Sequence, residues 1–159
     1  MAKAREIEGF AEAGSFAEAA ALAVEVRTDE LFSFGEGVLD TTDIERVHDM
    51  RVASRRLRAA LEIFAPCFPK QAHRRVLSDV KALADSLGER RDRDVRIAQL
   101  EGISKSLAED DHPGVTELIR ALRAEQRAAN TVVAEELEAI EESGLRSRLL
   151  ALVQEARSP

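Results

Sequence analysis

The chain has 159 residues, 45% of them hydrophobic and 33% charged, and this length is typical of one domain with a buried core. Its net charge is −7, and no run of eighteen apolar residues occurs, so we expect no membrane-spanning helix. The first ten residues lack the apolar stretch of a signal peptide, and Cys67 is the single cysteine, so we expect a reducing, cytoplasmic location.

The composition predicts an all-α fold. Alanine, leucine, glutamate, arginine and valine dominate, aromatic residues make up only 4%, and no segment alternates as a strand would. We therefore expect an antiparallel helical bundle with a long C-terminal helix, formed by a single domain over residues 1–159.

The N-terminal elements are predicted from their capping residues. Residues 1–14 resemble a short, loosely ordered helical segment, and Ser15 is placed to cap a helix over 15–39. The stretch TTDIE matches a capping box for the next helix, with Thr42 at the cap and Glu45 three residues later.

Prolines and glycines set the remaining boundaries. The second helix is expected to stop near Ala65, before two prolines, and a third to run over 70–87, with Gly88 at its end. ERRDRDV then opens a fourth helix to about Asp110, which completes a four-helix core over 15–110. Residues 113–157 form a long C-terminal helical segment that bends at a glycine.

Basic residues are concentrated in one part of this acidic chain. The segment from Arg46 to Arg96 contains 13 basic and 7 acidic residues, whereas the rest of the chain is strongly acidic. This distribution favours a directed anion site over a generally basic surface.

Four residues of the second helix form what we call the basic ladder. At 100° per residue, His48, Arg51, Arg55 and Arg58 share an arc of about 80°, opposite the apolar side of the helix. Arg56 lies outside this arc, and we expect it to pair with an acid on a neighbouring helix. The ladder is either a solvated face paired with such acids or a row of arginine forks that suits phosphate oxygens.

Further basic residues follow the ladder. Arg74, Lys81, Arg90 and Arg91 lie on the next helix and the turn after it, and antiparallel packing would return some of them to the ladder. On the long C-terminal helix, a second arginine series repeats a three-then-four spacing, and there we expect a surface paired with acids: Arg120, Arg123 and Arg127.

Two stretches together resemble the CHAD domain, the conserved histidine α-helical domain. VHDMRVASRRLRAALEIF carries the family's His-x-x-Arg-Val start and Arg-Arg-Leu-Arg run, and LADSLGERRDRDV carries its Leu-Gly-x-x-Arg-Asp-x-Asp-Val pattern. The resemblance implies a helical bundle that binds inorganic polyphosphate on a basic surface, often accompanies triphosphate-tunnel enzymes and has no known catalysis of its own.

The resemblance assigns roles to particular residues. Asp92 and Asp94 fall in the Arg-Asp-x-Asp motif, where we expect them to cap the helix start and orient arginines. No catalytic residue, metal ligand or cofactor is expected. With basic residues of the neighbouring turns added, the predicted polyphosphate ligands are His48, Arg51, Arg55, Arg56, Arg58, Arg74, Lys81, Arg90 and Arg91.

A full domain of this family has two similar halves. This chain carries the first signature, and residues 115–157 resemble the lead-in to the second half. One expectation is a two-fold homodimer in which a second copy supplies the other basic helix, and the alternative is a monomer whose long helix folds back on its own bundle. The apolar positions expected at such an interface are Leu118, Leu122, Val132, Val133, Leu137 and Ile140.

Three other functions compete with polyphosphate binding. His48 and Asp49 could indicate a metal-dependent phosphohydrolase of the HD type, but on a helix they point about 100° apart, and only His73 and His112 remain as further histidines. Nucleic-acid binding is disfavoured because the chain has no Trp or Tyr and a net charge of −7. A protein-interaction module without polyphosphate binding is the third alternative.

Overall fold

The computed structural model describes residues 3–158. These contain two short 3-10 turns, η1 (Ala65–Cys67) and η2 (Glu109–Asp111), and no strand. The five α-helices are α1 (Phe16–Phe32), α2 (Ile44–Ile63), α3 (Lys70–Ser104), α4 (His112–Glu142) and α5 (Leu145–Arg157).

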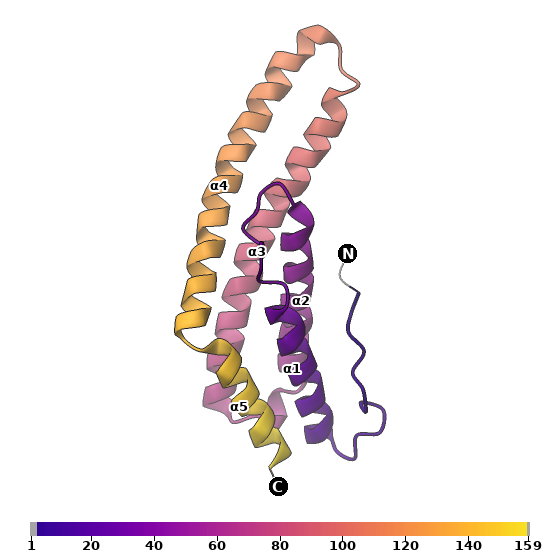
Figure 1. Cartoon of the computed structure of the whole chain (residues 1–159), viewed down its shortest axis with the longest axis vertical. Helices are drawn as coiled ribbons and strands as arrows, with labels where there is room; N and C mark the ends of the chain where they lie inside the picture. Colours follow the sequence, from indigo (N-terminus) through magenta and orange to yellow (C-terminus); the bar gives the residue numbers. More distant parts are fainter. Residues whose placement is uncertain (1–2, 159) are drawn as a thin grey trace.

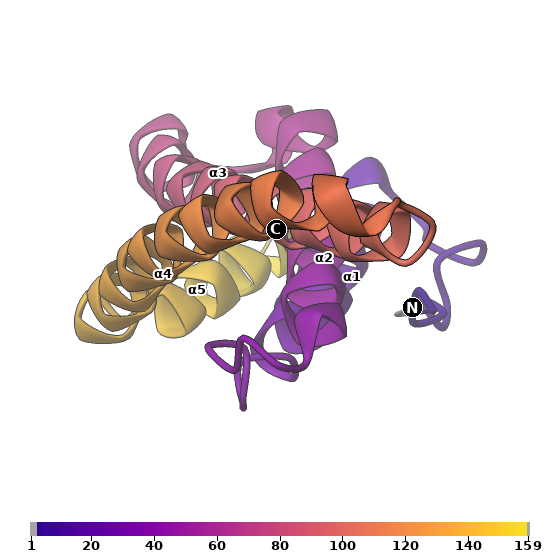
Figure 2. The same cartoon turned by 90° about the horizontal axis from the view of Figure 1, so that it is seen from above.

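α3 and α4 form a long antiparallel hairpin, and the other helices cover one end of it (Figure 1). α2 packs along α3, while α1 packs against both α2 and α5. The tip of the hairpin extends beyond α1 and α2, and the view from above shows α4 crossing over the rest of the bundle (Figure 2). The arrangement confirms the predicted all-α fold with a long helix near the C-terminus.

The main core lies among α1, α2, α5 and the first half of α3. Leu31, Leu57, Leu83 and Leu149 each come from a different helix and have no exposed surface. Burying a leucine side chain contributes roughly 1.5–3 kcal/mol. This packing fixes α2 and α3 side by side. Among the described residues, no helix has the length and apolar character needed to cross a lipid bilayer.

The N-terminal segment is not the helix expected from the sequence. Residues 3–14 contain turns and bends but no helix, and residues 1–2 lie outside the described part of the chain. The segment is nevertheless attached to the bundle. Arg27 donates a hydrogen bond to the carbonyl oxygen of Arg5 at 3.0 Å, and the Phe10 ring lies edge-on to Phe64 with 6.5 Å between centroids.

Of the N-caps predicted for the first two helices, only the first is confirmed. Ser15 caps α1 as predicted, because its Oγ accepts a hydrogen bond from the Glu18 amide at 3.0 Å. The predicted capping box at Thr42 is wrong. Thr42 instead donates through its amide to the Asp40 carboxylate at 2.8 Å, and Asp43 occupies the N-cap of α2 without a capping hydrogen bond from its side chain. This turn lowers the pKa of Asp40 through the hydrogen bonds from Thr42.

α1 and α3 depart from their predicted ends in opposite directions. α1 stops at Phe32 rather than near residue 39, before two glycines that lower helix stability. α3 is 35 residues long and continues through Gly88, so the predicted third and fourth helices are a single helix. Residues 15–110 therefore contain three long helices rather than four. A glycine inside a helix costs only about 1 kcal/mol, which packing against α2 on one side and α4 on the other outweighs.

The C-terminal helices match their predicted bounds closely. Gly144 has φ of 63°, the left-handed conformation that glycine adopts without steric cost, and it separates α4 from α5. The apolar positions expected at a dimer interface largely face their own chain: Leu122, Val133 and Ile140 are buried, and Leu137 packs against the core. Leu118 and Val132 are about half exposed, at 49% and 47%.

Candidate anion-binding groove

A groove runs between α2 and α3, with arginines on one wall. It encloses about 470 Å³, and α2 contributes Arg51, Arg55 and Arg58 to its lining. On α3, Gly88 lies beneath the first of these: a Cβ at this position would lie 3.8 Å from Arg51 Nε. Three members of the basic ladder therefore converge on one groove, as their spacing predicts.

Two of these arginines form no ion pair in the described part of the chain. The guanidinium of Arg51, which is half-buried, and that of Arg55, which is exposed, make no hydrogen bond or ion pair with residues 3–158. A guanidinium presents five N–H donors in a planar fork that matches carboxylate or phosphate oxygens. Two adjacent forks without partners leave strong donors available for an anion.

The third arginine shares an acid with a lysine from α3. Glu62 forms ion pairs with Arg58 at 3.0 Å and with Lys81 at 3.2 Å. The hydrogen bond from Arg58, followed by that from Lys81, lowers the pKa of the Glu62 carboxyl. Lys81 thus reaches α2 as predicted, but its ammonium group is already paired with Glu62. Arg74, two turns earlier on α3, is exposed and has no partner in the described residues.

The opposite wall of the groove is acidic, a feature that the sequence analysis missed. Asp85, Glu89 and Asp92 line it from α3. Glu89 is already paired with Arg93. Asp85 and Asp92 are seven residues apart, a helical repeat that becomes visible only when the segment is treated as one continuous helix. The basic side chains of the groove therefore lie on its α2 wall and the acidic ones on its α3 wall.

Arg56 lies away from the groove. It pairs with Glu30 of α1 at 2.7 Å, and Arg27 pairs with the other oxygen of the same carboxylate at 2.7 Å. Glu30 has no exposed side-chain surface, so it depends on both guanidiniums for compensation. The expectation that Arg56 pairs with an acid on a neighbouring helix is confirmed, and its inclusion among the ligands is corrected.

Arg90 is the second correction, because its side chain is fully buried and paired with Asp94 at 3.0 Å. Gln126 of α4 donates to the same carboxylate at 2.6 Å. Burial lowers the pKa of Arg90 and raises that of Asp94. Asp94 therefore orients an arginine as predicted. However, that arginine joins α3 to α4 inside the protein and is not a surface ligand.

Arg91 and Asp92 flank this buried pair on the outside of α3. Arg91 donates to the carbonyl oxygen of Ile44 at 2.8 Å and lies 3.3 Å from the carboxylate of Glu45, so it anchors the first turn of α2. Asp92 is exposed in the groove lining. Because α3 is continuous here, neither Asp92 nor Asp94 caps a helix start, contrary to the prediction.

His48 lies near the N-terminal end of α2 in a cluster with two acids. One ligand atom each from Glu45, His48 and Asp49 lies within 4.8 Å of the others. This corrects the expectation that His48 and Asp49 diverge, because flexible side chains bridge the angle between their Cα–Cβ directions. His73 and His112 do not join them, since their ring nitrogens contact the carbonyl oxygens of Leu61 and Leu107.

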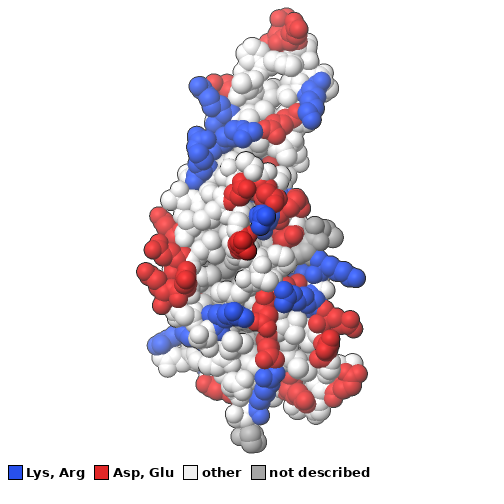
Figure 3. Space-filling model, viewed as in Figure 1, with Lys and Arg blue, Asp and Glu red and all other residues white. Residues whose placement is uncertain are grey.

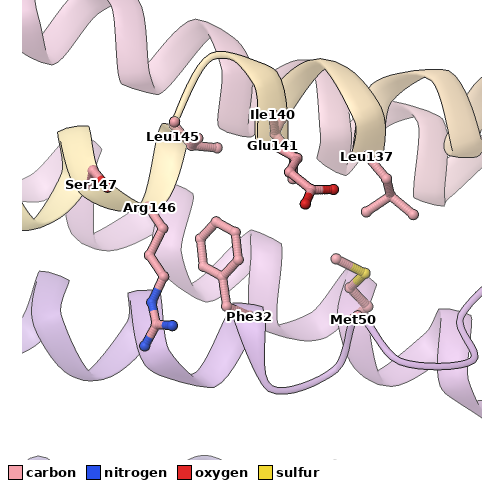
Figure 4. A pocket seen from close by; sticks show the side chains of 10 residues that line it. Phe32, Met50, Leu137, Ile140, Glu141, Leu145, Arg146 and Ser147 are labelled. Atoms are coloured by element: carbon pink, nitrogen blue, oxygen red, sulfur yellow. The ribbon is translucent and has the colours of Figure 1, made fainter.

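A second hollow is apolar and lies where α4 meets α5 (Figure 4). It encloses about 450 Å³, and Phe32, Met50 and Leu137 are among its lining residues. Arg146 at its rim lies over the Phe32 ring at 5.9 Å and pairs with Asp29 at 2.9 Å. Since its one arginine is already paired, this hollow is a poorer anion site than the groove.

The comparisons with known proteins give one family. The family model described as the CHAD domain matches residues 22–159, which include the whole groove. No characterised protein and no solved structure matches the chain significantly. The match covers most of the sequence and contains both stretches that carry the motif residues. The chain therefore belongs to the CHAD domain family.

Proposed function

We propose that the protein binds inorganic polyphosphate along the α2 wall of the groove. The observation that carries this proposal is the pair of guanidiniums, Arg51 and Arg55, that have no partner in the described part of the chain and lie beside Arg58 in one groove. The family is associated with polyphosphate binding, which supports the same ligand class. From Arg51 to Arg58 the helix rises about 10 Å, so the row suits an extended chain of phosphates better than one phosphate ion.

The roles in this proposal differ along the groove. Arg51 and Arg55 contact phosphate directly, and Arg58 with Lys81 joins when polyphosphate displaces Glu62. His48, one turn before Arg51 on α2, and Arg74, two turns before Lys81 on α3, contact longer chains. Of the nine predicted ligands, Arg56 and Arg90 are left out because each is held by a buried acid, and Arg91 because it is bonded to the Ile44 carbonyl and Glu45 outside the groove lining.

The direct test replaces both unpartnered arginines. Each charge-assisted contact contributes about 1.5–3 kcal/mol, so Arg51→Ala with Arg55→Ala should weaken polyphosphate binding by roughly a hundredfold or more in calorimetric titration. The matched control is Arg75→Ala with Arg157→Ala, which removes two exposed arginines that do not line the groove. Equal affinity of the folded double variant and the parent would contradict the proposal.

We also propose that the protein is a binding module in the cytoplasm and not an enzyme. Burial raises the pKa of the Cys67 thiol, so Cys67 is not an activated nucleophile. The competing function is metal-dependent phosphate hydrolysis at Glu45, His48 and Asp49. Incubation with polyphosphate and Mn²⁺ or Mg²⁺ should release no phosphate. Release that is lost in His48→Ala, but kept in the control variant above, would favour the hydrolase.

A further inference from the structure

The outward face of α4 carries opposite charges on its two halves. Basic side chains gather over α4 towards the tip of the hairpin, and acidic ones over its second half (Figure 3). All six residues concerned are exposed: Arg120, Arg123 and Arg127 in the first half, and Glu135, Glu138 and Glu142 in the second.

These charges are arranged almost symmetrically about Thr131. Arg127 and Glu135 each lie four residues from it, and Arg120 and Glu142 each lie eleven away. Arg123 and Glu138 lie eight and seven residues away, less than a turn from exact symmetry. Both series have spacings of three and four, so all six side chains point to one side of the helix.

Much of this charge is not neutralised by ion pairs in the part of the chain that the structure describes. Within residues 3–158, the three glutamates and Arg127 make no hydrogen bond or ion pair through their side-chain charges. Arg120 pairs with Glu117 at 2.7 Å and Arg123 with Glu101 at 2.5 Å. Both of these pairs are exposed, and exposed pairs are typically worth no more than about 1 kcal/mol, so a new partner can replace them.

The centre of the face allows two helices to approach closely. Ala124, Ala128 and Thr131 are small and exposed there, and Val132 is exposed beside them. Leu122, Val133 and Ile140 occupy the other side of α4 and are buried in its own bundle. A partner on the outward face therefore leaves the fold unchanged.

We infer that this face pairs with the same face of a second copy, with the two α4 helices antiparallel about an axis near Thr131. In this arrangement, the arginines of each copy lie opposite the glutamates of the other. A parallel arrangement places like charges opposite each other, so the pattern specifies the antiparallel pair. The inference is independent of the groove and of polyphosphate.

Charge reversal tests the pairing. At low salt the parent should have about twice the mass of the 17.5 kDa chain by light scattering. Replacing the three arginines by glutamate makes both halves of the face acidic, and replacing the three glutamates by arginine makes both halves mainly basic. Each variant should be monomeric alone, and an equimolar mixture should recover the doubled mass.

The charge-reversal experiment has a control on another helix and three outcomes that would contradict the inference. Arg75→Glu, on α3, should keep the doubled mass, and circular dichroism reports whether each variant is folded. A monomeric parent, or folded variants that remain dimeric alone, would overturn the inference. A mixture that stays monomeric although both variants are folded would also overturn it, because pairing by charge requires recovery.

Discussion

The arginines of the ladder region differ in function because they differ in what lies opposite them. Arg56 and Arg90 each face a buried carboxylate, which must be compensated: removing Arg90 would leave Asp94 without its ion pair, and removing Arg56 would leave Glu30 with Arg27 alone. Arg51 and Arg55 line a groove, and their guanidiniums have no partner among residues 3–158. At the scale of single residues, the availability of the guanidinium for an anion therefore depends on the burial of the nearest acid.

Glu62 should compete with polyphosphate for Arg58 and Lys81. Glu62→Gln frees both cations, and because exposed pairs are weak we expect polyphosphate affinity to rise by up to about fivefold at neutral pH. The pKa of Glu62 is lowered from 4.5, so the carboxylate stays charged as pH falls through the physiological range and is neutralised only at pH values below 4.5.

The pH dependence gives the measurement for this prediction. The ratio of variant to parent affinity, measured by titration, should stay constant between about pH 6 and 8 and approach one below 4.5. A ratio that already falls between pH 6 and 8 would show that another group controls the competition.

At the scale of elements, the continuity of α3 through Gly88 decides which side chains reach the groove. A Cβ at Gly88 would make only ordinary van der Waals contact with Arg51, 3.8 Å away. Gly88→Ala should therefore raise the free energy of unfolding by about 0.5–1 kcal/mol, measured in urea, because alanine stabilises a helix interior. Gly88→Leu should instead displace Arg51 and weaken polyphosphate binding. A destabilised Gly88→Ala would mean that the glycine itself is needed there.

The same helix marks the limit of what the sequence could predict. Two boundaries set by local signals were right, Ser15 at the start of α1 and Gly144 between α4 and α5, whereas the capping box at Thr42 was not. Gly88 is an equally visible local signal, but tertiary packing on both sides of α3 outweighed it. The convergence of Arg51, Arg55 and Arg58 was predictable because it depends only on helical periodicity.

Residues whose roles depend on a neighbouring helix were not predictable in this way. Helical periodicity separated Arg56 from the basic ladder. It could not identify the partner of Arg56, Glu30, which lies 26 residues away in the sequence. Arg90 looked like part of an exposed turn because its segment was divided at Gly88. Its burial depends on Asp94 one turn later and on Gln126 from α4, a contact across 32 residues.

At the scale of the whole molecule, the protein has a net charge of −7 but carries a local row of arginines in the groove. Long-range repulsion from the acidic surface opposes any polyanion, while short-range arginine contacts favour one that fits the groove. The groove should therefore favour a flexible ligand with a high charge density. It should not favour a nucleic acid, because its lining contains no aromatic side chain on which a base could stack.

Polyphosphate should accordingly bind more tightly than single-stranded DNA of equal total charge, and binding should fall by roughly tenfold or more between about 50 and 300 mM salt. The salt dependence arises because each phosphate contact releases a counterion, so the variant without Arg51 and Arg55 should lose affinity less steeply. Competition titrations with labelled polyphosphate, repeated at each salt concentration, measure both quantities. DNA that competes as well as polyphosphate would point to a general polyanion surface. An unchanged salt slope in the variant would place the phosphate contacts on other cations than these two arginines.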